Sequence, residues 1–320
     1  MKTLIGGTRG SALALWQTEH TVATLRAQAA RTGTSIDLAV RIITTRGDTD
    51  QSPVLAGKLG KGFFTLELEA ALRSGEIDFA VHSLKDLPTE SPPDLAIAAV
   101  LPRGPMHDLL LVAPDAVADG SGRELPLVAG AKVGSSSLRR SALLKRYSPR
   151  SVATPLRGNV PTRLTKLAQG HYQAIVLAAA GVERLGLDLE KLRAFDLNPR
   201  VWIPAPGQGA VAVQCRAGDA IVRGVFSAVS HAPTADATAI ERLYLHGLEG
   251  GCTTPFGCAV DGPDLCLGLD VHGGWRRSIA PLAGADRPRL LANLQAPEYR
   301  EPPGDEWLYR EHRSSEMPVA

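Results

Sequence analysis

The sequence lacks several features that would point to particular classes of protein. No apolar run approaches the length needed to span a bilayer, and the short apolar patch after Lys2 is too short for a signal-peptide core. The four cysteines include no C-x-x-C pair, and the spacings of Cys252, Cys258 and Cys266 differ from those of common structural zinc sites. We therefore expect a cytoplasmic protein with reduced thiols, no membrane association and no metal site.

The chain also has little excess of one charge over the other and few aromatic residues. The chain has 35 Lys and Arg against 33 Asp and Glu, a net charge of only +2, and 5% aromatic residues. Nucleic-acid binding depends on many phosphate contacts and often on stacking side chains, so we exclude a nucleic acid as the partner. What the chain does have is 320 residues with 44% hydrophobic content. That is enough for two or three globular domains.

Strand-like and helix-like segments alternate along the chain, which predicts α/β architecture with parallel pairing. Strands are expected at 3–6, 36–44, 77–81, 95–101, 127–133, 174–179 and 210–214. Helices are expected at 12–30, 63–73, from Ser141 onward and at 234–247, with a turn at Ala180-Gly181. The last 30 or so residues are weakly patterned, and no element is predicted there.

Two breaks in composition predict the domain organisation. Pro102 to Pro105 reads as a hinge, and Trp202 to Gly209 as a return hinge, so that 210–214 could rejoin the first sheet. We expect one lobe from 1–101 and 209–224, a second from 102–208, and a small α+β C-terminal domain from 225–320. The fold class is then α/β, with two lobes joined by a double crossover and a cleft between them.

Arginines recur in the turns that follow predicted strands. The stretch Gly134 to Arg140 places three serines and two arginines between a strand and a helix, where free N–H groups and planar guanidinium forks can bind an anion. Taken alone, it could equally be a Ser N-cap with two solvated arginines. Repetition of the theme favours a ligand with several carboxylates or phosphates. The candidate residues are Arg9, Arg139, Arg140, Arg157, Arg163 and Arg184.

Two further residues could carry chemistry. Asp86 lies beside Lys85 at a strand end and could stabilise a developing cation or move a proton, or it could form a structural salt bridge. Cys252 follows two glycines that leave space for a bulky group on its thiol, although a loop cysteine is more often inert. The loop Lys58 to Gly62 could cradle phosphate or form a lid, but it lacks the spacing of a P-loop.

Eight short motifs, in order, resemble the porphobilinogen deaminase (hydroxymethylbilane synthase) family. They span about Ile5 to Gly257. The motifs are Thr8 to Gln17, Thr45 to Asp48, Gly60 to Phe64, His82 to Asp86, Gly134 to Arg140, Leu156 to Arg163, Pro206 to Gly209 and Leu248 to Cys252. The chain departs from the family pattern at Met106-His107-Asp108, where the family commonly has Pro-Arg-Asp and a local ion pair, and the likeness fades after Gly257.

The resemblance implies periplasmic-binding-protein-like lobes and a transferase acting on porphobilinogen. It implies a dipyrromethane cofactor joined by a thioether to Cys252. Four porphobilinogens are condensed onto it with loss of ammonia, and hydroxymethylbilane is released by hydrolysis. Asp86 is the implied catalytic residue, Lys61 and Phe64 lie on the implied lid, and the protein is expected to be a monomer. The implied cofactor- and substrate-binding residues are Arg9, Ser11, Gln17, Lys85, Ser137, Arg139, Arg140, Arg157, Arg163 and Arg184.

Two alternatives to this enzyme remain open at the level of the sequence. A two-lobed anion-binding or effector-sensing module would share the lobes and the basic cleft, but it requires neither Asp86 nor the Gly-Gly-Cys motif. A family member that kept the fold and lost turnover would also fit the divergent tail. The mass of the purified chain separates the first alternative from an enzyme that carries a covalent cofactor.

Overall fold

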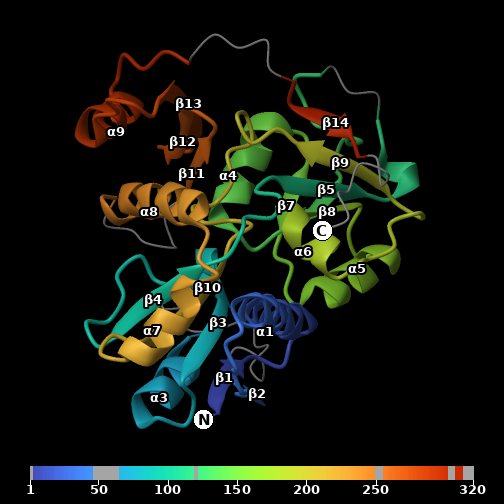
Figure 1. Cartoon of the computed structure of the whole chain (residues 1–320). Helices are drawn as coiled ribbons and strands as arrows, with labels where there is room; N and C mark the ends of the chain where they lie inside the picture. The colour runs from blue at the N-terminus through green and yellow to red at the C-terminus, as the bar shows by residue number, and fades with distance from the viewer. Residues whose placement is uncertain (1–2, 46–64, 119–121, 249–254, 302–306, 313–320) are drawn as a thin grey trace. The chain divides into compact units, whose positions relative to one another are not determined.

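The chain folds into two compact units. The computed structural model describes residues 3–45, 65–118, 122–248, 255–301 and 307–312 (Figure 1). Unit 1 consists of Met1–Pro105 and Pro206–Cys252, and unit 2 of Met106–Ala205 and Thr253–Ala320. Each unit combines helices with a central sheet, so the α/β class expected from the sequence is confirmed. Whether 225–320 forms a domain of its own stays a prediction.

Unit 1 is built on a five-stranded sheet in the order β2-β1-β3-β10-β4. Its strands are β1 (Leu4–Thr8), β2 (Leu38–Ile42), β3 (Phe79–Ser83), β4 (Leu95–Val100) and β10 (Val211–Arg216). Its helices are α1 (Ala12–Thr32), α3 (Leu66–Ser74), α7 (Ala220–Ser227) and α8 (Ala232–His246). The predicted parallel pairing is confirmed for β1 with β2 and β3.

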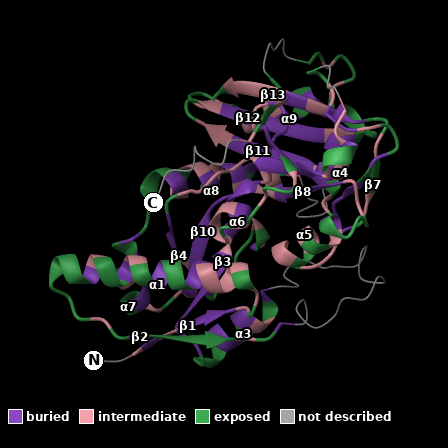
Figure 2. Cartoon of the chain, turned by 90° about the vertical axis from the view of Figure 1, so that its right-hand side faces the viewer, coloured by how far each residue is buried: buried purple, intermediate pink, exposed green. Residues whose placement is uncertain are grey.

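Helix α1 begins and ends where its sequence provides caps. The Ser11 hydroxyl accepts a hydrogen bond from the Ala14 N–H, and Gly33 ends the helix in the left-handed conformation. The buried residues of α1 recur at helical spacing from Gln17 to Ala29, and Val22 and Leu25 join the core over the sheet. Figure 2 shows the resulting alternation of buried and exposed turns along α1. The first turn of α1 is thereby held at the end of β1.

Strand β10 rejoins the sheet of unit 1, as predicted, but it is antiparallel to both neighbours. Val211 pairs with Ser83, so β10 enters the sheet at the end where β3 finishes and runs the opposite way. The general expectation of parallel pairing is wrong here, because β10 is not connected to β3 by a crossover helix. The buried strand β10 therefore pairs with β3 along its whole length, from Phe79 to Ser83.

The segments before and after the excursion into unit 2 lie side by side within unit 1. The Gly104 N–H donates to the Gly209 carbonyl, and the Arg103 Nε donates to the Gln208 carbonyl. Gly209 has φ 86, and a Cβ there would lie 2.5 Å from the Gly104 oxygen, so only glycine fits. Fully buried Glu241 of α8 accepts from both terminal nitrogens of Arg103 and ties α8 to these segments.

Unit 2 contains a six-stranded sheet in the order β14-β9-β5-β8-β6-β7. Its strands are β5 (Asp108–Val112), β6 (Lys132–Gly134), β7 (Val152–Thr154), β8 (Ala174–Ala178), β9 (Arg193–Leu197) and β14 (Tyr309–Glu311). Its helices are α4 (Leu138–Tyr147), α5 (Val160–Ala168) and α6 (Ala179–Arg184). Strands β6, β7 and β8 are parallel, whereas β5 is antiparallel to β8 and β9.

Two predictions of local structure in unit 2 are wrong. The strand expected at 127–133 is reduced to the three residues of β6, because Gly130 turns the chain with φ 77 just before it. The turn expected at Ala180-Gly181 is the first part of α6, since the alanines that surround Gly181 favour a helix strongly enough to include it. Both β6 and α6 therefore lead directly into segments with candidate arginines.

The C-terminal part of unit 2 adds a three-stranded antiparallel sheet and a tail. Strands β11 (Phe256–Asp261), β12 (Asp264–Val271) and β13 (Gly274–Pro281) form this sheet, and α9 (Arg287–Gln295) follows. Cys266 and Trp275 belong to the same hydrophobic core as Leu143 of α4. Although no element was expected in the tail, α9 and β14 form there, and β14 pairs with β9 at the sheet edge.

Candidate functional site

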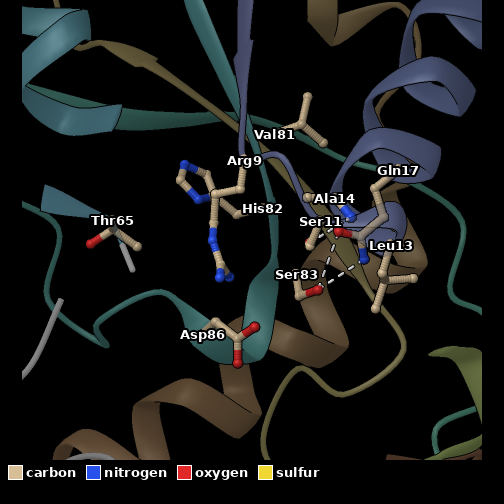
Figure 3. Close-up of a pocket in the computed structure, with 10 residues that line it drawn as sticks. All are labelled: Arg9, Ser11, Leu13, Ala14, Gln17, Thr65, Val81, His82, Ser83 and Asp86. Carbon is tan, nitrogen blue, oxygen red and sulfur yellow. Dashed lines mark hydrogen bonds between the residues drawn. The ribbon is translucent and has the colours of Figure 1, made fainter. Parts of the chain in front are cut away.

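A pocket of unit 1 lies at the carboxyl ends of β1 and β3, where the sequence predicts a ligand site (Figure 3). Arg9 follows β1, Ser11 caps α1, and Asp86 ends the short 3-10 helix Leu84–Asp86 that follows β3. The pocket is lined by Arg9, Ser11, Leu13, Ala14, Gln17, Thr65, Val81, His82, Ser83 and Asp86. Four of the predicted site residues, Arg9, Ser11, Gln17 and Asp86, are thus brought together.

The pocket holds one carboxylate and one guanidinium. Figure 3 shows the Arg9 side chain pointing toward the Asp86 carboxylate. Within the part of the chain that the structure describes, Asp86 takes part in no ion pair. A carboxylate that lines a pocket without a fixed counter-ion can stabilise a positive charge on a bound ligand.

Two hydrogen-bonded pairs order the rim of the pocket. Gln17 Nε2 donates to the Ser83 hydroxyl over 2.8 Å, and Ser83 is in turn 3.2 Å from Gln17 Oε1. Lys85 Nζ donates to Gln208 Oε1 over 3.3 Å, which links the residue before Asp86 to the return segment. Because α1 and β3 are joined in this way, the positions of Ser11 and Asp86 are fixed relative to each other.

His82 is a pocket residue that the sequence analysis did not single out. It is 6% exposed, and burial followed by the positive charge of Arg9 lowers its pKa to about 4, although the Gln214 side chain acts in the opposite sense. The ring is therefore uncharged at neutral pH. The sequence predicted a strand that ends at Val81, so His82 was expected in the following turn. In the structure it lies within β3, four residues before Asp86.

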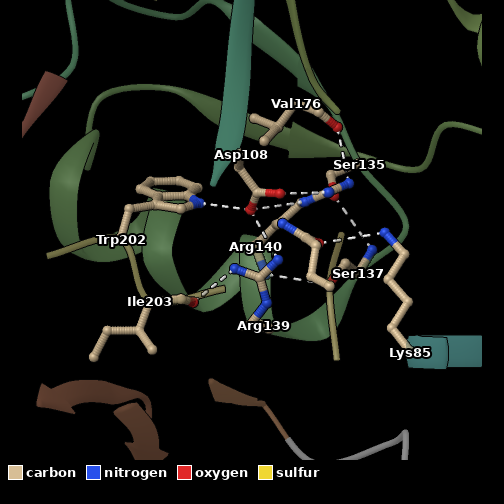
Figure 4. A network of polar contacts seen from close by, with 10 residues as sticks. Lys85, Asp108, Ser135, Ser137, Arg139, Arg140, Val176, Trp202 and Ile203 are labelled. Carbon is tan, nitrogen blue, oxygen red and sulfur yellow. Dashed lines mark hydrogen bonds and ion pairs between the residues drawn. The ribbon is translucent and has the colours of Figure 1, made fainter. Parts of the chain in front are cut away.

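Unit 2 holds the second group of predicted site residues, in the first turn of α4 (Figure 4). Ser137 is the N-cap and accepts from the Arg140 N–H. Arg140 donates from Nη2 to Asp108 Oδ1 over 2.7 Å, and Arg139 donates from Nη2 to Asp108 Oδ2 over 2.8 Å. Trp202 Nε1 also donates to Asp108 Oδ2, over 2.9 Å. We call Asp108, Arg139, Arg140 and Trp202 the Asp108 network.

The Asp108 network decides one alternative that the sequence left open. Ser137 is an N-cap, as the simpler interpretation proposed, but Arg139 and Arg140 are only 5% and 7% exposed and are not solvated. Arg139 also donates from Nη1 to the Ile203 carbonyl, and Arg140 donates from Nη1 to the Val176 carbonyl. Burial would raise the pKa of Asp108, but the two guanidinium groups outweigh it and hold that pKa far below its usual range.

An ion pair at the position where the chain departs from the family pattern is present after all. Asp108 pairs with two arginines of α4, and the preceding His107 donates from Nε2 to Asp196 Oδ1 over 2.9 Å. His312 of the tail also contacts Asp196 Oδ1 over 2.9 Å. His107 thus contacts Asp196, and the carboxylate of Asp108 is paired independently of the residue at 107.

The other predicted arginines of unit 2 lie at the start of α5 and at the end of α6. Arg163 of α5 donates from Nε to the Gly158 carbonyl, and Lys166 Nζ donates to the Arg157 carbonyl, so both arginines belong to one turn. Arg184 ends α6, and burial lowers its pKa. Cys252, Lys61 and Phe64 lie outside the described residues. Across the described residues, His, Cys, Asp and Glu side chains form no group of three or more suited to a metal ion.

Comparison with known proteins decides the family. Residues 4–224 match the family model described as porphobilinogen deaminase, dipyromethane cofactor binding domain. The chain belongs to the porphobilinogen deaminase family. A porphobilinogen deaminase of Stenotrophomonas maltophilia is 44% identical over 269 residues, 83% of this chain and 85% of the relative. One of Paraburkholderia phytofirmans is 41% identical over 291 residues, 90% of this chain and 82% of the relative.

Family membership makes the chain an enzyme, a transferase of the hydroxymethylbilane synthase class. Two solved structures show distant similarity. The periplasmic VFT2 domain of Bordetella pertussis BvgS has a TM-score of 0.41 and 18% identity, and covers 75% of this chain and 93% of its own. The substrate-binding protein AbpA of Streptococcus pneumoniae has a TM-score of 0.36 and 13% identity, and covers 77% and 90%. No helix among the described residues is long and apolar enough to cross a membrane.

Proposed function

We propose that this member of the porphobilinogen deaminase family condenses four porphobilinogen units head to tail, with loss of ammonia, and releases hydroxymethylbilane by hydrolysis. The observation that carries the proposal is the Asp86 pocket. It combines a carboxylate without an ion pair among the described residues and a basic residue, Arg9, within the region that matches the family model. The chain is then a turnover enzyme and not only an anion-binding module.

Asp86 is the proposed catalytic residue. When ammonia leaves porphobilinogen, the pyrrole becomes an electron-poor, azafulvene-like cation. A fixed carboxylate in a partly enclosed pocket stabilises such a cation more strongly than water does, because it is already oriented toward the developing charge. Asp86 is the last residue of a short 3-10 helix, and the preceding Lys85 donates a hydrogen bond to Gln208. The Asp86 carboxylate therefore needs little rearrangement to face a bound cation.

The arginines are the proposed carboxylate-binding residues. Each pyrrole of the substrate bears an acetate and a propionate, so the growing chain is a polyanion. The Asp108 network contains two guanidinium groups and one carboxylate and therefore has a net positive charge in a buried place. A buried surplus of positive charge favours a ligand carboxylate. We assign the same role to Arg9, Arg157, Arg163 and Arg184, and supporting polar contacts to Ser11, Gln17, Lys85 and Ser137.

A dipyrromethane cofactor fits this set of residues. Arg9 in unit 1 and the Asp108 network in unit 2 each carry positive charge that would suit its carboxylates, and we propose that a thioether to Cys252 attaches it. When bound, it supplies the nucleophilic pyrrole carbon that starts the chain. The residues of the protein bind and orient it, and we propose that Lys61 and Phe64 belong to a lid. Monomeric state and cytoplasmic location remain part of this proposal.

The mass of the intact chain tests the proposal. Protein purified from cells able to make porphobilinogen should be heavier than the bare polypeptide by two pyrrole units. Cys252→Ser should lack this increment, while Cys258→Ser, a buried cysteine of β11, should keep it. The heavy form should also release ammonia from porphobilinogen. An unmodified wild-type chain that leaves porphobilinogen unchanged would count decisively against the enzyme.

A further inference from the structure

His82 in β3 is a buried polar residue that the proposed chemistry does not use. Its Nε2 atom is sealed from solvent and has no hydrogen-bond partner among the described residues. A buried donor or acceptor without a partner costs about 1–3 kcal/mol, so native proteins retain few of them. Its presence next to Asp86 therefore calls for a physical explanation.

Gln214 of β10 has a complementary buried atom. Its Oε1 also lacks a partner among the described residues, and the residue is 2% exposed. His82 pairs with Ala212 and Gln214 pairs with Ala80, so His82 and Gln214 lie diagonally on one face of adjacent strands. The nearby Gln214 side chain acts to raise the pKa of the imidazole, so it favours a proton on the ring. No hydrogen bond joins the two atoms as the structure stands, but of the two ring nitrogens Nε2 is the one with an acceptor still to be satisfied on the same face of the sheet. A proton on Nε2 leaves the lone pair on Nδ1.

The ring borders the same pocket as Asp86. His82 lines it together with Arg9 and Ser83, and Figure 3 shows the imidazole beside the Arg9 side chain. The ionisable groups that line the pocket from the described elements are Arg9, Asp86 and His82 itself. Since the ring is uncharged, it adds a hydrogen-bond acceptor and leaves the charge balance between Arg9 and Asp86 unchanged.

We propose that His82 is a further ligand-binding residue of the Asp86 pocket, and that it accepts a hydrogen bond from a pyrrole N–H through Nδ1. This inference rests on the proposed function, because the ligand it requires is a pyrrole. A pyrrole N–H can only donate, so it needs an acceptor. A second carboxylate beside Asp86 would raise the pKa of both groups by repulsion, whereas a neutral imidazole does not. Gln214 is a positioning residue that holds the ring in the required tautomer.

Two amide substitutions separate the two ring nitrogens. The side-chain amide of Asn reaches about the position of Nδ1, and that of Gln about the position of Nε2. His82→Asn should therefore bind porphobilinogen nearly as well as the wild type, within about threefold in KM. His82→Gln and His82→Phe should raise KM about five- to tenfold, which is the loss of one ordinary hydrogen bond. The exposed His171→Asn serves as the matched control and should leave KM unchanged.

Nitrogen-15 NMR of the wild-type imidazole provides a measurement that does not depend on folding of a variant. Nδ1 of His82 should carry no proton, and its resonance should shift when porphobilinogen is added. An unchanged KM in His82→Phe, a loss in His82→Asn equal to that in His82→Gln, or a protonated Nδ1 would overturn the inference. If one of these results is found while the wild type still turns over porphobilinogen, the proposed function is retained and only the role of His82 is wrong.

Discussion

At the scale of single residues, burial keeps the His82 side chain of the Asp86 pocket uncharged. His82 is sealed against the sheet and stays neutral, whereas Asp86 and Arg9 reach the pocket from segments just beyond β3 and β1. The three side chains therefore offer a negative, a positive and a neutral group within one small region. That combination suits a ligand with carboxylates, ring N–H groups and a transient positive charge.

The first prediction concerns Asp86→Asn. The amide keeps the size of the side chain and loses its charge, so the fold and cofactor content should be retained. The rate of turnover should fall by about 100-fold or more, which corresponds to about 3 kcal/mol of lost stabilisation of the transition state. Ammonia release measured at saturating porphobilinogen checks this. Near-normal turnover in Asp86→Asn would remove the charge-stabilising role.

The second prediction concerns the pH dependence of stability. The pKa of His82 is lowered to about 4 in the folded protein from an ordinary value of 6.5. Its contribution to stability is complete above pH 6.5 and is lost as the pH falls toward 4, because the unfolded chain takes up the proton first. The difference corresponds to about 3 kcal/mol. Urea unfolding between pH 7 and pH 4 should show a shallower decline in His82→Phe than in the wild type. Equal declines would contradict the prediction.

Sequence reasoning identified some of the site residues and missed others for a physical reason. Arg9, Ser11 and Asp86 follow strand ends, and local pattern reveals strand ends. Asp108 was noted only as the last residue of the segment that departs from the family pattern at Met106-His107. Its partners Arg139 and Arg140 lie more than thirty residues away and come close only in the folded unit. His82 was missed because the apolar residues around it predict a buried strand but do not show that a histidine nitrogen there lacks a partner.

At the scale of elements, α4 is held at its first turn by the Asp108 network. Arg139 and Arg140 would each be costly to bury without a counter-charge, and Asp108 of β5 supplies it. Leu143 and Leu144 anchor the next turn of α4 in the core shared with β12 and β13. The helix start is therefore fixed both by charge and by packing.

The third prediction concerns Asp108→Asn. The substitution leaves two buried guanidinium groups without a counter-ion, so the free energy of unfolding should fall by about 3–5 kcal/mol. Arg150→Gln breaks the exposed ion pair with Glu124 and should change it by less than about 1 kcal/mol. Urea denaturation of both variants measures the difference. A small effect of Asp108→Asn would show that water or another group compensates the arginines.

The elements themselves were largely predictable, and the exceptions share a cause. Capped, periodic segments such as α1 and α8 were located within a few residues. The strand expected at 127–133 was too long because the apolar run was given more weight than Gly130, which turns the chain within it. The tail was given no element because β14 has only three residues, and pairing with β9 rather than its own pattern makes it a strand.

At the scale of the whole molecule, the chain leaves unit 1 after Pro105 and returns to it at Pro206. The two segments are held together inside unit 1 by Arg103, Glu241 and the backbone contact of Gly104 with Gly209. An excursion of about 100 residues thus begins and ends at one place. This arrangement lets a sequence insert one folded unit within another without separating the parts of the first.

The fourth prediction tests that junction with a matched pair of glycines. Gly209→Ala places a methyl group against the Gly104 carbonyl in a backbone conformation that disfavours side chains, so unfolding should become easier by about 1–3 kcal/mol. Gly218→Ala adds the same methyl group where no atom lies within 4 Å and should be nearly neutral. Thermal unfolding compares the two. Equal stability would show that the junction can relax without cost.

Strand β14 has a consequence for how this protein behaves among its own copies. An uncovered edge strand has unpaired amide and carbonyl groups that can pair with a strand of another chain, and such pairing promotes aggregation. Here the last described segment lies along β9 and is fastened by Asn198 at one end and by His312 at the other. A chain shortened before Trp307 would leave β9 as an exposed edge strand, through which two copies can pair.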